Sequence, residues 1–215
     1  MAHLFTEEYI FLKYHNQILK RPNPNWHFDS NELKAIVMIY YKLLRGATND
    51  IKTDLPVTYF REVLYKSLGM VEDTLMKHIY SALGSITDSV PLKHWINTMS
   101  LFLRGTLEEK IKYCFDVYDT SGKNEIRYED MVTLLRSCVF KHRDEEVEEI
   151  VKDFADIILK KLDYDKDGII TFADFNETVK NDPMMLECLG QCLPDVTHAN
   201  AFLTTFTDKL NTSIF

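Results

Sequence analysis

The stretch Asp163-Tyr164-Asp165-Lys166-Asp167-Gly168-Ile169-Ile170-Thr171-Phe172-Ala173-Asp174 decides the fold of this chain. Aspartates stand at its first, third and fifth positions, glycine at the sixth, isoleucine at the eighth and aspartate again at the twelfth. A hard divalent cation takes about six to eight oxygen ligands. A short loop can aim alternate side chains at one point only if its backbone turns sharply in the middle. The spacing therefore predicts a cation-binding loop.

Each position of the loop has an expected role in the calcium-binding pattern of an EF-hand. Gly168 makes the sharp turn, because a residue without Cβ enters the left-handed region at little steric cost. Ile170 points away from the ion, into a short β-ribbon with a partner loop. The expected metal ligands are the carboxylates of Asp163, Asp165, Asp167 and Asp174, the carbonyl of Ile169, and the hydroxyl of Thr171 or a water that it holds.

The twelfth position departs from the usual pattern, because Asp174 stands where glutamate is common. Its side chain is one methylene shorter and reaches the ion with fewer oxygens. We therefore expect a lower calcium affinity and better competition by magnesium. The alternative is an acidic surface turn that binds nothing, which the regular alternation of aspartates followed by glycine disfavours.

Two further stretches have the length of such a loop but lack its ligands. The stretch 119–130 keeps Asp119 at the first position and Asn124 at the turn, yet Lys123 places an ammonium at the fifth position, where an oxygen belongs. The stretch 83–94 has no carboxylate at its first, third, fifth or twelfth position. The sequence therefore predicts one strong calcium site.

EF-hands work in pairs, because the residues at the eighth position form a two-stranded ribbon. We expect Ile126 to pair with Ile170, and Val90 to be the ribbon residue of the earlier pair. The predicted fold is all-α, of the EF-hand superfamily, with two lobes of paired hands and additional terminal helices. The expected divisions are an N-terminal helix and linker (1–27), a lobe of two degenerate hands (28–104), a lobe with the degenerate loop 119–130 and the intact loop 163–174 (105–181), and a helical tail (182–215).

Helices with apolar faces connect these loops. Apolar periodicity and capping signals predict helices over 6–20, 31–45, 56–68, 70–82, 95–103, 128–140 and 145–162, then shorter ones ending near 181, beginning at 183 and spanning 199–210. Thr106 and Glu109 form a capping box, and Gly46 is expected just past the end of a helix. The stripe of the helix 145–162 that should enter the core is Val147, Ile150, Val151, Phe154, Ile157, Ile158 and Leu162.

Composition excludes several classes of protein. Among 215 residues, 25 basic and 33 acidic side chains give a net charge of −8, which argues against binding nucleic acid through phosphate neutralisation. No apolar run has the length of a membrane span, no signal peptide opens the chain, and Ala2 replaces the glycine that N-myristoylation needs. We therefore expect a soluble intracellular protein.

The four cysteines, Cys114, Cys138, Cys188 and Cys192, show no disulfide-framework spacing and are expected to be reduced and buried. Cys188, Cys192 and His198 could be zinc ligands, but no C-x-x-C pair supports that interpretation. Met70, Met76, Met99 and Met131 fall on apolar helix faces, where they line either a partner groove or the core.

An enzyme is disfavoured, because the chain has no P-loop, no nucleophile elbow and no H-E-x-x-H motif. Two binding functions stay open. The first is a calcium-responsive adaptor whose hydrophobic groove grips a partner helix. The second is a docking subunit with an inherited EF-hand fold and constitutive partner binding.

Three runs, Ser100–Lys110, Ile169–Phe175 and Gly190–Asp195, resemble the calaxin family, ciliary EF-hand proteins related to the neuronal calcium sensors. The likeness extends from about residue 33 to residue 195. It implies a calcium sensor in the cytoplasm and on the axoneme of cilia or sperm flagella, with outer-arm dynein, its docking complex and tubulin as partners. Where the family keeps calcium ligands in three loops, this chain keeps them in one, which makes a calcium-independent docking role the second interpretation.

Overall fold

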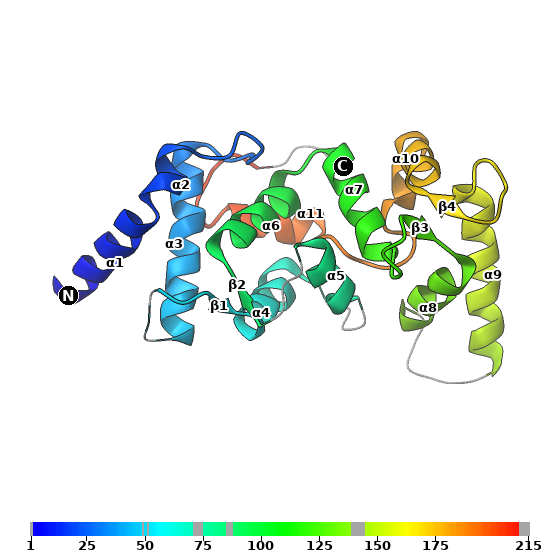
Figure 1. The fold of residues 1–215 in the computed structure, drawn as a ribbon, viewed down its shortest axis with the longest axis horizontal. Helices are drawn as coiled ribbons and strands as arrows, with labels where there is room; N and C mark the ends of the chain where they lie inside the picture. Colours follow the sequence, from blue (N-terminus) through cyan, green and yellow to red (C-terminus); the bar gives the residue numbers. More distant parts are fainter. Residues whose placement is uncertain are drawn as a thin grey trace. The chain divides into compact units, whose positions relative to one another are not determined.

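The computed structural model describes residues 2–48, 50, 52–70, 75–84, 88–138 and 145–210. Over these residues the chain is mainly helical with short antiparallel ribbons, which confirms the predicted all-α EF-hand fold. The chain forms two compact units, and neither is continuous in sequence. Figure 1 labels their elements.

The first unit takes its helices from both ends of the chain. Its elements are α1 (Ala2–Tyr14), α2 (Asn16–Lys20), α3 (Ser30–Ala47), β1 (Leu55–Pro56), α4 (Val57–Leu68), β2 (Ser89–Val90), α6 (Leu92–Arg104) and α11 (Val196–Leu203). The C-terminal helix α11 packs on α4 and α6.

The second unit holds the intact loop. Its elements are α5 (Met76–Ala82), α7 (Leu107–Tyr118), β3 (Glu125–Ile126), α8 (Tyr128–Cys138), α9 (Glu145–Leu162), β4 (Ile170–Thr171), α10 (Phe172–Asn181) and the 3-10 helix η1 (Pro183–Glu187). Helix α5 packs on α7, so this helix belongs to a different unit from α6, which follows it in sequence.

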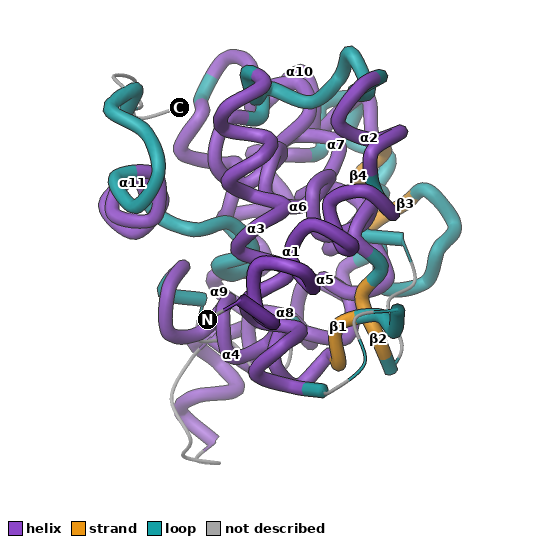
Figure 2. The backbone as a smooth tube through the Cα atoms, turned by 90° about the vertical axis from the view of Figure 1, so that its left-hand side faces the viewer, coloured by secondary structure: helices purple, strands orange, loops and turns teal. Residues whose placement is uncertain are grey.

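Each unit contains one antiparallel ribbon, drawn in orange in Figure 2. In the first unit Leu55 pairs with Val90. In the second unit Ile126 pairs with Ile170. All four side chains are fully buried. The predicted ribbon residues are therefore confirmed, and each ribbon joins two loops through its backbone.

Aromatic side chains fill the core of the first unit. Trp95 is fully buried between Tyr40 and Phe60, with ring centroids 6.1 and 6.2 Å away. Its indole N–H donates to the carbonyl oxygen of Ile36 at 3.1 Å. The buried indole thus has the partner that a polar group away from water needs.

The core of the second unit is held to the segment that follows η1. The Tyr118 hydroxyl donates to the carbonyl oxygen of Gly190 at 2.7 Å, and the Tyr113 hydroxyl donates to that of Cys192 at 3.1 Å. Gly190 has φ 131°, and a Cβ there would lie 2.8 Å from Leu75 Cδ1. A residue with a Cβ would therefore be strained at this position.

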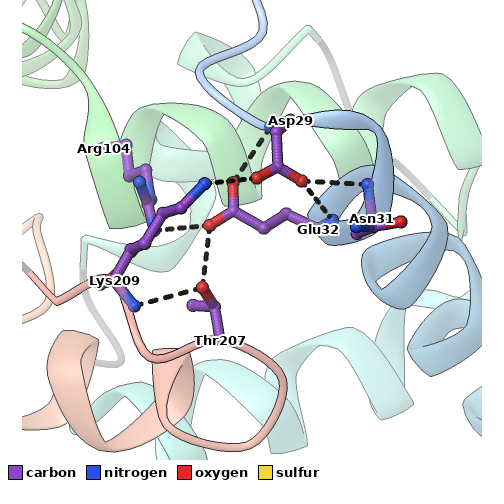
Figure 3. Close-up of polar contacts among 6 residues, drawn as sticks. All are labelled: Asp29, Asn31, Glu32, Arg104, Thr207 and Lys209. Atoms are coloured by element: carbon purple, nitrogen blue, oxygen red, sulfur yellow. Dashed lines mark hydrogen bonds and ion pairs between the residues drawn. The ribbon is translucent and has the colours of Figure 1, made fainter.

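The C-terminal segment is tied to the start of α3 by a buried carboxylate, Glu32, which is 3% exposed (Figure 3). Glu32 accepts hydrogen bonds from Arg104 Nη2 at 2.8 Å and from Thr207 Oγ1 at 2.9 Å. Asp29 caps α3, and its hydrogen bonds from the Lys209 ammonium and the Glu32 amide lower its pKa to about 2. These contacts hold Thr207 and Lys209 against the start of α3 within the first unit.

Several helix bounds differ from the predicted ones. The helix predicted over 6–20 begins at Ala2 and is divided at His15. Helix α3 continues through Gly46, because the Thr48 amide closes its last turn on Leu44. Helix α6 begins at Leu92 rather than 95, and α11 ends at Leu203 rather than 210. The predicted stretches 71–74 and 139–140 lie outside the described residues.

The predicted core stripe of α9 is wrong for three of its residues. Val151, Ile158 and Leu162 are buried, whereas Ile150, Phe154 and Ile157 are 45%, 49% and 54% exposed. Helix α9 packs against α8 and α10, which cover one side of it. The apolar stripe predicted from the sequence is wider than the surface of α9 that α8 and α10 cover.

The burial of the methionines and cysteines decides between the roles predicted for them. Met70, Met76, Met99 and Met131 are buried, so they are core residues rather than groove residues. All four cysteines are free thiols. Cys114 and Cys192 are buried as predicted, but Cys188 is half-buried and Cys138 is exposed, because the end of α8 lies at the surface. Among the described residues, no helix combines the length and apolar character needed to cross a membrane.

The first ribbon provides a test of the fold. The buried Tyr40 hydroxyl donates to the Val90 carbonyl at 2.9 Å and accepts from the Leu55 amide at 3.0 Å. Tyr40→Phe should leave both groups unpaired and lower the free energy of unfolding by about 1–3 kcal/mol. Thermal denaturation measures this. Tyr59→Phe is the matched control, since its hydroxyl makes one exposed bond to Gly46. Equal effects of the two substitutions would contradict the bridging role of Tyr40.

Candidate metal centre

The loop 163–174 connects α9 to α10 in the second unit. Asp163 follows directly after α9, and its amide still donates to the Leu159 carbonyl at 2.9 Å. Its backbone is therefore held by the end of the helix, and the residue is 8% exposed. Thr171 ends β4 and caps α10. The two ends of the loop are thus held by regular elements.

Three predicted ligands converge in the structure. One carboxylate oxygen each of Asp163, Asp165 and Asp167 lies within 4.8 Å of the other two. Within the described part of the chain, this is the one group of His, Cys, Asp or Glu side chains close enough to hold a metal ion. Cys188, Cys192 and His198 accordingly form no such group.

Backbone amides hold these carboxylates in place. Asp163 Oδ2 accepts from the Gly168 amide at 2.9 Å, and its Oδ1 accepts from the Asp167 amide at 3.2 Å. Asp167 Oδ1 accepts from the Ile169 amide at 2.8 Å. Gly168 has φ 84°, the left-handed turn expected of the sixth position. The loop therefore closes around its carboxylates through its own hydrogen bonds.

Asp174 and Thr171 are hydrogen-bonded to each other. Asp174 Oδ2 accepts from the Thr171 amide at 2.9 Å and from the Thr171 hydroxyl at 2.5 Å. This is the capping box of α10. The spacing of Thr171-Phe172-Ala173-Asp174 is that of a capping box, a signal in the sequence that was not used to predict this cap. Asp174 lies outside the group of three carboxylates and is 7% exposed.

Negative charge accumulates in the loop. Reduced solvation, followed by the charges of Asp167, Asp174 and Asp163, raises the pKa of Asp165. Like charges held close together disfavour ionisation, and a bound divalent cation reverses this effect. The donor set consists of carboxylates, which hard cations such as calcium prefer.

The degenerate loop 119–130 has the same backbone pattern without the same charges. Asp119 Oδ2 accepts from the Asn124 amide at 2.7 Å, as Asp163 does from Gly168. Asp130 Oδ2 accepts from the Arg127 amide at 3.1 Å, as Asp174 does from Thr171. Asn124 takes the left-handed turn with φ 59°. This loop keeps the shape of a calcium loop, but Ser121 and Lys123 stand where the intact loop has Asp165 and Asp167.

The chain is similar in sequence to several known proteins. The sequence profile of the EF-hand domain pair matches residues 108–180, which span both loops of the second unit. Calaxin of Danio rerio is 37% identical over 180 residues, covering 82% of this chain and 85% of its own length. Calaxin of Homo sapiens is 37% identical over 172 residues, covering 79% and 82%. The chain belongs to the calaxin family.

This calaxin-family chain is also similar to a recoverin family protein of Dictyostelium discoideum, 26% identical over 206 residues that cover 86% of the chain and 90% of that protein. It is a calcium-binding EF-hand protein of the calaxin type. Proteins of this type are non-enzymatic regulators that act through protein partners, so the chain is not an enzyme.

The earlier pair of hands in this calaxin-family chain offers few ligands. In the stretch 83–94, Leu83 and Gly84 follow α5, and Ser89 and Val90 form β2. His94 is in the first turn of α6 and is half-buried. Ser85 and Thr87, the third and fifth positions, lie outside the described residues. No side chain of this stretch belongs to a metal-binding group among the described residues.

The two loops of the second unit allow a matched test of the metal centre. Asp163→Ala should weaken calcium binding at least about tenfold, because it removes a charged ligand. Asp119→Ala removes the equivalent bond to the sixth-position amide but no ligand, so calcium affinity should change little. Isothermal titration calorimetry of both variants, repeated in magnesium, measures this. Equal losses would show that the carboxylates act only by shaping the loops.

Proposed function

We propose that this chain is a calcium-responsive adaptor on the axoneme of cilia or sperm flagella, where it regulates motility. The observation that carries the proposal is the convergence of Asp163, Asp165 and Asp167 in a member of the calaxin family. The family likeness supports outer-arm dynein, its docking complex and tubulin as partners. A cytoplasmic pool that exchanges with the axoneme fits this role.

The proposed calcium site is single and uses Asp163, Asp165, Asp167, Ile169, Thr171 and Asp174. Lys123 opposes a second ion in the neighbouring loop, since its ammonium repels a divalent cation. Asp174 has a short side chain, and one of its oxygens is bonded to Thr171. We therefore infer that magnesium competes at this site, because it needs fewer ligands than calcium.

Calcium acts first on the second unit. The occupied loop is joined to the loop 119–130 through the pairing of Ile170 with Ile126, so one ion orders both hands. The hands of residues 28–104 have no comparable ligands, and an ion that does not bind cannot shift a conformational equilibrium. We therefore assign partner binding without calcium to the first unit, which holds most of residues 28–104, and calcium dependence to the second unit, which holds residues 106–194.

A second candidate function is a calcium-independent docking subunit of the axoneme. The observation that favours it is the uneven loss of ligands, since the loop 83–94 has no carboxylate at a ligand position. In that case the loop 163–174 contributes to folding alone, through the hydrogen bonds that Asp163 accepts from the Asp167 and Gly168 amides.

Capture of axonemal proteins by the full chain separates the two functions. The full chain is required, because α11 packs on α4 and α6 and a fragment ending at 104 lacks it. We expect some partners to be retained in chelator and others to be gained in calcium, and Asp163→Ala should lose only the second set.

A capture pattern that is identical in calcium and in chelator would establish the docking subunit instead. Failure to retain any dynein or docking-complex subunit, with calcium binding intact, would overturn the axonemal assignment.

A further inference from the structure

The first unit contains a pocket of about 670 Å³ far in sequence from any EF-hand ligand. It is lined by residues of α2, of the loop 21–26 and of the start of α6. Ligand pockets in proteins have volumes of about 300–1,000 Å³. The pocket is therefore large enough for several side chains of a bound peptide.

Three cations line this pocket. Lys20 and Arg21 come from the end of α2, and Lys93 comes from the first turn of α6. All three are exposed, and within the described residues none of them has an ion-pair partner. The whole chain carries a net charge of −8, so a group of unpaired cations is a local exception. Such a group attracts a negative ligand.

The wall of the pocket is fixed before any ligand binds. The Trp26 indole N–H donates to Asn97 Oδ1 on α6 at 2.6 Å, and the Trp26 amide donates to the Asn23 carbonyl at 3.0 Å. The next amide, of His27, donates to Ser100 Oγ at 2.9 Å. These bonds tether the loop 21–26 to α6 and orient the half-buried Trp26 ring along the pocket. A preorganised wall reduces the entropic cost of binding.

We propose that this pocket binds a short acidic peptide segment of a protein partner. Carboxylates of the segment pair with Lys20, Arg21 and Lys93, and an apolar side chain between them packs on Trp26 and Ile18. Arginine binds carboxylates with two parallel hydrogen bonds, which gives the site orientation as well as charge. The site is independent of the calcium loop and of the proposed ciliary location.

A peptide fits the charges better than an extended polyanion does. Nucleic acids and anionic membranes present negative charge over long distances, and a chain with net charge −8 repels them outside the pocket. A short peptide segment contacts only the three cations of the pocket and avoids the negative charge on the rest of the chain. The apolar contact offered by Trp26 and Ile18 also favours a peptide over a bare phosphate ion.

Fluorescence anisotropy of the full chain with a fluorescein-labelled peptide tests this. The probe is a short peptide of glutamate and alanine with a central leucine, and its control has glutamine in place of glutamate. We expect the acidic peptide to bind, the glutamine peptide to bind at least about tenfold more weakly, and the difference to shrink in high salt as exposed charges are screened. Trp26 emission should change with the same midpoint, since Trp95 is fully buried.

Two triple variants complete the test. Lys20→Gln, Arg21→Gln and Lys93→Gln together should weaken binding at least about tenfold. Lys34→Gln, Lys42→Gln and Lys52→Gln together remove the same charge at exposed positions of the same unit and should leave binding unchanged. Circular dichroism verifies that both variants fold, and these surface positions are not in the core.

Three results would overturn the proposal. They are equal binding of the two peptides at low salt, equal effects of the two triple variants, and displacement of the acidic peptide by inorganic phosphate or anionic phosphatidylserine vesicles at comparable concentrations of charge. The last result would assign the pocket to a phosphate group.

Discussion

A carboxylate at the first position of a loop, bonded to the amide of the sixth, is the interaction on which the second unit depends. Asp163 binds the Gly168 amide and Asp119 binds the Asn124 amide, with distances of 2.9 and 2.7 Å. Each bond needs a left-handed residue at the sixth position, which glycine supplies in one loop and asparagine in the other. The same device therefore shapes both loops, and the remaining side chains decide which of them attracts a cation.

The ribbon transmits this constraint from one hand to the other. Ile126 and Ile170 are buried and paired, so ordering of one loop restricts its neighbour. A hand that has lost its ligands can still serve as the partner that completes an intact hand. This explains physically why a degenerate loop keeps its turn and its capping carboxylate after an ammonium has replaced a ligand.

The sequence predicted features that are set locally and missed those set by distant packing. Loop spacing predicted the convergence of Asp163, Asp165 and Asp167, and the capping box at Thr106 is present because its bonds lie within one turn. The exposure of Phe154 was not predictable, because periodicity does not show how many neighbours cover a helix. Nor could the sequence show that Lys93 joins Lys20 at one pocket, since they are far apart in the chain.

The most direct test of the account is a calcium titration of the isotope-labelled full chain, followed by amide chemical shifts in NMR spectra. The Gly168 amide, which lies against the Asp163 carboxylate, should shift and saturate at one calcium ion per chain. The amide signal of Ile126, across the ribbon, should shift with the same midpoint. The amide signal of Leu55, in the first ribbon, should not shift. Shifts of Asn124 that continue after Gly168 has saturated would reveal a second ion and contradict the single coupled site.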